Sequence, residues 1–99
     1  MYEIGDRIGA VSHAEGDTIY IFGFGEYKGE SVPGIQAKGF LADMLKDANV
    51  ENPCLVLDSG EMIWGCECWW GPEMKVKDQM ELYTNVQHLS IEDARRGRS

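Results

Sequence analysis

The sequence predicts an α+β fold, a small antiparallel, curved sheet or partly open barrel with two helices packed on it, in the order β-β-α-β-β-α-β. Three observations predict this fold. Residues 18–24 are dense in β-branched and aromatic side chains, as strands are. Residues 54–73 have the pattern of a hairpin that runs directly into the start of a helix. Residues 36–48 repeat apolar side chains at spacings of three and four, as an amphipathic helix does.

The first two strands are expected at residues 7–13 and 18–24, joined by a turn at 14–17. Gly9 weakens the first pattern, whereas the second is strong. Aromatic side chains alternate with isoleucines along the second strand, so both of its faces are apolar. We therefore expect this strand to lie in the centre of the sheet or to be covered on both sides.

Residues 23–34 contain four glycines in twelve positions. Glycine favours bends and weakens strands, so we expect a loop here, with one short strand near residues 25–27. The spacing does not match a dinucleotide-binding fingerprint, because the third glycine comes one position late and no helix follows directly. We interpret the segment as bends in the sheet and a turn.

The helix expected at residues 36–48 has one apolar face, which we expect to be buried. That face consists of Ala37, Phe40, Leu41, Met44, Leu45 and Ala48. Asn49 is suited to end the helix in a left-handed conformation, and Asn52-Pro53 prevents its continuation.

The hairpin is centred on Asp58-Ser59-Gly60, a three-residue loop with glycine at the position that needs a positive φ. Its register places Cys54 near Trp64. The return strand is expected to be continuous over residues 62–70. One face of that strand would carry Met62, Trp64, Cys66, Cys68 and Trp70, and the other Ile63, Gly65, Glu67 and Trp69. We expect the first face, which is apolar and rich in sulfur, to belong to the core.

After the hairpin, Gly71-Pro72-Glu73 predicts the start of a helix that runs to Leu82. Its buried stripe is expected to be Val76, Met80 and Tyr83. A last strand is expected at residues 85–91.

The domain organisation expected from these elements is one α+β domain at residues 1–94, followed by a basic, disordered tail at 95–99. Ser90 could cap a final helical turn at the junction.

The chain is strongly acidic, with nine basic and seventeen acidic residues and a formal net charge of −8. Three of the basic residues are arginines of the tail, so residues 1–94 carry six basic and seventeen acidic residues. Such a body does not bind a phosphate backbone non-specifically and suits a basic partner. The chain has no apolar run of about 18 residues and no basic region followed by an apolar stretch at its N-terminus. We therefore expect a cytoplasmic protein that does not bind membranes.

The expected partner-binding residues lie on the glycine-rich segment, on the Trp69 face of the hairpin and on the first strand. They are Arg7, Phe24, Glu26, Tyr27, Lys28, Glu67 and Trp69. A large aromatic side chain beside glycine on a half-polar face can stack on a base or anchor a protein partner. If a helix covers that face, Trp69 belongs to the core instead.

The three cysteines allow an alternative, a zinc- or thiol-dependent site made of Cys54, Cys66 and Cys68, completed by His13 or His88. Structural zinc sites use pairs of cysteines with two to four residues between them, whereas Cys66 and Cys68 have only one residue between them. Cysteines also pack well beside tryptophan and methionine, so we expect core thiols and no cofactor. Redox chemistry would need an activated thiolate, and no cation lies near the cysteines in the sequence.

The two histidines are not arranged for catalysis, because strand alternation points Ser12 away from His13. We expect the protein not to be an enzyme.

Two stretches, Gly-Phe-Gly-Glu-Tyr-Lys-Gly-Glu-Ser-Val-Pro at 23–33 and the hairpin at 52–73, resemble a group of small, uncharacterised proteins encoded by tailed phages and prophages. The most specific part is Trp-Gly-Cys-Glu-Cys-Trp-Trp-Gly, and the resemblance spans residues 7–82. It implies a genomic context and a non-enzymatic accessory role, and it attaches no activity.

The function expected from these observations is that of a small phage-encoded binding protein that antagonises a host defence or nucleic-acid enzyme by binding it, in the cytoplasm of an infected cell. One alternative is an oligomeric sponge that sequesters a nucleotide signalling molecule. The second alternative is the zinc- or thiol-dependent protein. A third interpretation, a minor virion or structural component, has no sequence feature for or against it. The protein can also form a homo-oligomer, which the sponge alternative favours.

Overall fold

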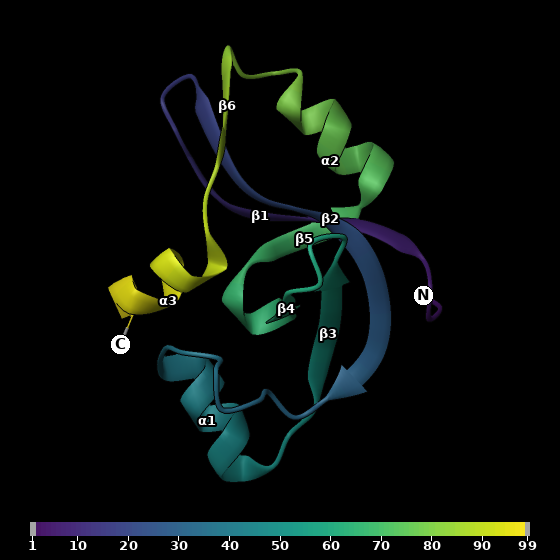
Figure 1. Cartoon of the computed structure of the whole chain (residues 1–99), viewed down its shortest axis with the longest axis vertical. Coiled ribbons are helices and arrows are strands. Elements are labelled where there is room, and N and C mark those ends of the chain that lie inside the picture. The colour runs from purple at the N-terminus through teal and green to yellow at the C-terminus, as the bar shows by residue number, and fades with distance from the viewer. Residues whose placement is uncertain (1, 99) are drawn as a thin grey trace.

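The computed structural model describes residues 2–98 of the chain, and side chains as far as residue 97. Within this range the chain forms six strands in one sheet, three α-helices and a short 3-10 turn (Figure 1), which confirms the predicted α+β fold. The elements are β1 (Arg7–Glu15), β2 (Thr18–Ser31), α1 (Phe40–Ala48), β3 (Asn52–Leu57), β4 (Met62–Trp64), η1 (Gly65–Glu67), β5 (Trp69–Pro72), α2 (Glu73–Met80), β6 (Asn85–His88) and α3 (Ile91–Arg98).

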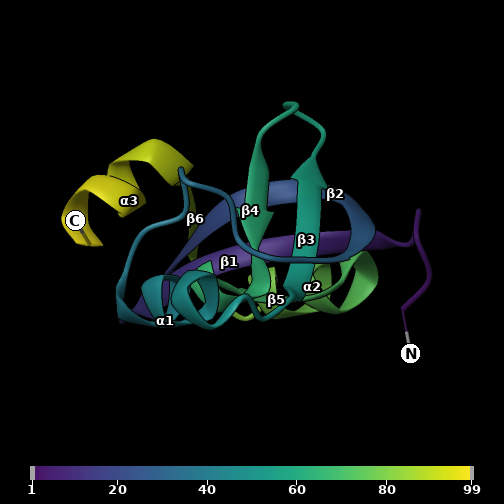
Figure 2. The ribbon, with the colours of Figure 1, turned by 90° about the horizontal axis from the view of Figure 1, so that it is seen from below.

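The sheet has the strand order β4-β3-β2-β1-β5, and all neighbours in this path are antiparallel. β6 pairs with the first residues of β2 in parallel, on the same edge that β3 occupies further along. β2 is therefore central, as its two apolar faces predict. β4 and β5 lie at opposite ends of the strand path, yet only residues 65–68 separate them in the chain. So short a connection, about 17 Å at most, requires the sheet to curve strongly (Figure 2).

The glycine-rich segment is part of a strand, so the loop expected at residues 23–34 is wrong as far as Ser31. Gly23 and Gly29 take φ angles of 140° and 93°, and the ladders on either side of β2 shift register near them. These glycines bend the strand without ending it. Gly25 has another role, because a Cβ there would lie 2.1 Å from the carbonyl oxygen of Val56.

The packing divides between the two faces of the sheet. The main core lies on one face, where Ile8, Leu55 and Ile63 are completely buried and Ile91 of α3 packs against them. α2 covers part of the other face through Val76, with Met80 and Tyr83 partly buried beside it, as predicted. α1 covers the β3–β4 part of that same face, over the small cluster Ala37, Ala42, Cys54 and Trp64.

The return strand of the hairpin is interrupted, so the prediction of one continuous strand over residues 62–70 is wrong. The hairpin turn and the pairing of Cys54 with Trp64 are confirmed. After Trp64 the chain turns through η1, where the side chain of Asn52 accepts a hydrogen bond from the backbone N–H of Cys66 at 2.7 Å. Trp64 consequently packs under α1, whereas Trp70 packs on the opposite face with the main core.

The C-terminal region also differs from the expectation. The strand β6 ends at His88, and the residues expected to form a disordered tail are helical from Ile91 to Arg98; Ser99 lies outside the described residues. Ser90 caps this helix, since its Oγ accepts a hydrogen bond from the backbone N–H of Asp93 at 3.3 Å. In the described part of the chain, no helix is long and apolar enough to cross a membrane.

Candidate functional site

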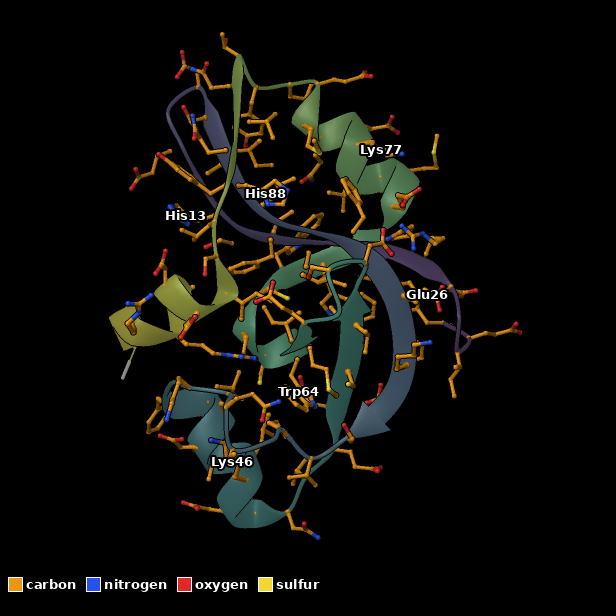
Figure 3. All side chains as sticks on the ribbon, in the orientation of Figure 1. His13, Glu26, Lys46, Trp64, Lys77 and His88 are labelled. Carbon is orange, nitrogen blue, oxygen red and sulfur yellow. The ribbon has the colours of Figure 1, made fainter. Side chains whose placement is uncertain are left out.

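The structure divides the residues predicted to bind a partner among three environments. Arg7, Phe24, Glu26 and Lys28 share the face of the sheet on which α2 packs, because the register pairs Arg7 with Glu26 and alternation keeps the even-numbered residues of this part of β2 on one side. Glu26 and Lys28 form an exposed ion pair at 3.0 Å. The ring of Phe24 lies 5.5 Å below the ammonium group of Lys77, a residue seen on α2 in Figure 3.

Arg7 is engaged in holding three elements together. Its guanidinium donates hydrogen bonds to both carboxylate oxygens of Asp58, at 2.8 and 2.7 Å, and to Glu73 at 2.9 Å. These bonds join β1 to the β3–β4 turn and to the first residue of α2. The hydrogen bonds from Arg7 lower the pKa of both carboxyl groups, and the hydrogen bonds to the two carboxylates raise the pKa of Arg7.

Tyr27 does not share a surface with Trp69, contrary to expectation. Its side chain is 9% exposed and packs in the main core, where its ring stacks on Trp70 with centroids 5.9 Å apart. Its hydroxyl donates a hydrogen bond to Glu30 at 2.7 Å, and this bond raises the pKa of Tyr27.

Trp69 is 48% exposed and lies beside Val11 on the opposite face of the sheet. Gly65 and Glu67 do not accompany it there, because η1 interrupts the strand.

Glu67 is a buried ion-pair partner, which the strand pattern placed wrongly on an exposed face. Both of its carboxylate oxygens accept hydrogen bonds from Arg95 at 2.8 Å, through Nε and Nη2. The backbone N–H groups of Trp64 and Lys38 also donate to this carboxylate, at 3.2 and 3.5 Å. Glu67 therefore connects α3, β4 and the segment before α1. The sequence signal that could have found Arg95 is the Ser90 cap, which predicts a helix where a tail was expected.

The cysteine hypothesis gains no support from the geometry. Cys54 is buried between α1 and the sheet, and this burial raises the pKa of its thiol. Figure 3 shows both histidines far from Trp64, the residue opposite Cys54, so neither can complete a site there. Within residues 2–98 no three or more histidine, cysteine or acidic side chains come together as a metal site would require.

Ser12 and His13 are closer than strand alternation predicts. A register shift between Val11 and His13 lets the Ser12 hydroxyl and His13 Nδ1 form a hydrogen bond of 2.8 Å. The pair is exposed, and the ring of His13 stacks on Tyr20 at 4.6 Å. Nucleophilic catalysis by serine and histidine also needs a third group that orients the base. No carboxylate of the described residues contacts His13, so the pair lacks this group.

The most unusual surface belongs to α1. Phe40 and Ile35 are 82% and 88% exposed, and Leu41 and Met44 are about half exposed. At 3.6 residues per turn, Phe40, Leu41 and Met44 occupy one arc of the helix, and Ala42 faces the opposite way. Only Ala42 of the helix is fully buried. Of the apolar face predicted to be buried, Phe40, Leu41 and Met44 therefore point outward, whereas Ala37 is buried ahead of the helix and Leu45 is partly buried. We call Ile35, Phe40, Leu41 and Met44 the α1 face.

A cleft of about 430 Å³ lies between the segment that precedes α1, the β3–β4 turn and α3. Its lining consists of Gln36, Lys38, Glu61, Glu92, Arg95 and Arg96. A smaller hollow of about 200 Å³ lies where β3 and β6 diverge along β2, beside Phe24, Asp58, Ser59 and His88. There the Asp58 carboxylate is held by Arg7, and the Ser59 hydroxyl donates to Glu61 at 3.2 Å.

Comparison of the chain with protein-family models, with curated proteins and with solved structures finds no match. The functional argument therefore depends on the α1 face, the cleft and the charge of the molecule.

Proposed function

We propose that this protein is a non-enzymatic binding protein that docks on another protein through the α1 face. The observation that carries the proposal is the outward-pointing apolar arc of α1. Soluble proteins rarely expose contiguous apolar side chains of this size unless they form a binding surface. A helix that places Phe40, Leu41 and Met44 on one side matches the way amphipathic helices fit into apolar grooves.

The charge of the chain suggests the chemistry of the partner. The net charge is −8, and the exposed carboxylates of Asp43, Asp47 and Glu51 lie along α1 and just after it. Lys46 on the same helix donates to the carbonyl of Ala37 at 2.6 Å and pairs with Asp43 at 3.6 Å, so it offsets one of these three negative charges. A partner with an apolar groove bordered by lysine and arginine is complementary to this surface.

The resemblance to phage-encoded proteins narrows the proposal to a host protein. Enzymes that act on nucleic acids carry the basic surfaces that an acidic protein recognises. We therefore propose that the protein binds a defence or nucleic-acid enzyme in the cytoplasm of an infected host cell and blocks its basic surface.

The test is co-purification from the host with the α1 face removed. Burial of a large apolar side chain contributes about 1.5–3 kcal/mol, so Phe40→Ser with Met44→Ser should weaken binding at least about a hundredfold. The matched control is Leu82→Ser, since Leu82 is as exposed as Phe40, at 82%, but lies beyond the end of α2. We expect the wild-type and control proteins to retain the same basic protein in stoichiometric amount, and the double variant to lose it.

Two results would contradict the proposal. A partner retained equally by all three proteins would show that it binds elsewhere. If the isolated protein forms a dimer in size-exclusion chromatography and the double variant is a monomer, a second copy of the chain occupies the α1 face instead.

A further inference from the structure

The 430 Å³ cleft beside α3 shares no lining residue with the α1 face, although Gln36 and Lys38 lie between Ile35 and Phe40 in the chain, and it has a volume typical of sites for small molecules. Three segments that are distant in the sequence form it: residues 36–38, the β3–β4 turn and α3. Figures 1 and 2 both place α3 beside the path of the chain that leads into α1. The buried carboxylate of Glu67 fixes two of these segments, since it accepts hydrogen bonds from Arg95 and from the backbone N–H of Lys38.

Arg95 is held in one orientation with part of its guanidinium unused. Nε and Nη2 donate to Glu67 at 2.8 Å, and Nη2 also donates to the carbonyl of Met62 at 2.9 Å. Among the described residues, Nη1 and its two N–H groups have no acceptor. A guanidinium that is already fixed loses little conformational entropy when it binds a carboxylate.

The other charges of the cleft are of both signs. Lys38 makes no side-chain ion pair within the described residues, and the Gln36 amide supplies further donors. Glu61 and Glu92 place carboxylates on the same lining. Arg96 is paired with Asp93, and the charge of Arg95 is compensated by Glu67. The cleft therefore offers donors and acceptors together with little net positive charge, which disfavours a nucleotide with several phosphates.

We propose that this cleft binds a small zwitterion of the amino-acid class, either a free amino acid or a short peptide. Its carboxylate binds Nη1 of Arg95 and the ammonium group of Lys38, and its ammonium group binds Glu61 and Glu92. The ligand carries one charge of each sign, and the lining carries charges of both signs. Each protein charge that the ligand shields from water therefore gains a partner of opposite sign.

The experiment titrates the full chain with glycylglycine, acetate, methylammonium or inorganic phosphate, one compound at a time. Binding is monitored through the NMR signals of the Gln36 side-chain amide and the Arg95 Nε–H group. For a few exposed charge-assisted hydrogen bonds we expect a dissociation constant of about 1 mM for glycylglycine. Acetate and methylammonium each present half of the ligand, so they should bind at least about tenfold more weakly.

Lys38→Gln and Glu92→Gln should each weaken the binding of glycylglycine about tenfold, since each removes one charged contact. Lys75→Gln and Glu81→Gln make the same charge changes on or beside α2 and should leave binding unchanged. The proposal is overturned if about 10 mM glycylglycine shifts neither signal, or if phosphate binds as tightly as glycylglycine. It is equally overturned if Glu92→Gln strengthens binding, because the ligand would then be an anion.

Discussion

At the scale of the residue, Glu67 connects the C-terminal helix α3 to the hairpin through its two hydrogen bonds from Arg95. In the sequence it is a charged residue in an alternating strand, which favours exposure. In the structure its side chain has no exposure, and four hydrogen bonds from Arg95, Trp64 and Lys38 satisfy its carboxylate. Trp64 is three residues from Glu67, but Arg95 and Lys38 are distant in the sequence, so the pattern around Glu67 could not have identified them as its partners.

Removal of the Arg95 side chain should therefore destabilise the folded protein. Arg95→Ala leaves the Glu67 carboxylate buried without its counter-charge, and we expect the free energy of unfolding to fall by about 3–5 kcal/mol in urea denaturation. Adding Glu67→Gln to this variant should recover part of the loss, because the buried charge is then gone. Lys28→Ala serves as the control, since it breaks an exposed ion pair with Glu26 and should cost at most about 1 kcal/mol. A loss equally small for Arg95→Ala would mean that the buried pair does not contribute to stability.

At the scale of the element, α1 shows that apolar periodicity predicts a helix but does not predict whether its apolar face is buried. Apolar spacing correctly predicted a helix in this region, and Asn49 ends it with a φ of 56°, as expected. The same spacing predicted that Phe40, Leu41 and Met44 would be buried. Amphipathicity identifies an apolar face but does not say which molecule covers it. Here the sheet packs against the side of the helix that carries Ala42, and Ala37, in the segment before the helix, joins the same cluster.

The exposed position of Phe40 can be tested without any partner. Phe40→Ser should change the free energy of unfolding by less than about 0.5 kcal/mol, because an exposed side chain loses no packing. Ile63→Ala, in the centre of the main core, should lower it by about 2–5 kcal/mol. Both values come from chemical denaturation of the isolated protein. A cost of several kcal/mol for Phe40→Ser would place this side chain in a core, as the sequence pattern suggested.

Across the whole molecule, the sequence predicted α1, α2, the hairpin and the central position of β2, because local composition determines these features, whereas it placed a tail where α3 lies. It did not predict that the strand continues through Gly23 and Gly29, since the composition of a bent strand and of a loop is the same. It also missed η1, which depends on a hydrogen bond from Cys66 to the distant Asn52. Of the candidate site residues, Trp69 is exposed as required, whereas Tyr27 and Glu67 are buried.

Arg7 contributes to the stability of the whole fold in acid, because its bonds to Asp58 and Glu73 join β1, the β3–β4 turn and α2. The pKa values of Asp58 and Glu73 are lower in the folded protein, so the unfolded chain takes up protons first as the pH falls. The stabilisation is complete above the usual carboxyl pKa of about 4 and is lost as the pH falls through the lowered values. Thermal melts between about pH 6 and pH 3 should therefore show a smaller loss of stability in Arg7→Gln than in the wild type. Equal losses in both proteins would exclude this contribution.

The ion pair of Glu67 and Arg95 has a further consequence for the outer side of β4, the last strand of the path. The backbone N–H of Trp64 and the carbonyl of Met62 point away from β3, and these are the groups that an additional strand would use. Glu67 accepts a hydrogen bond from the first, and Arg95 donates one to the second. The side chains thus occupy the edge of the sheet and protect it from edge-to-edge aggregation. A chain that lost α3 would expose this edge as a template for self-assembly into larger, insoluble species.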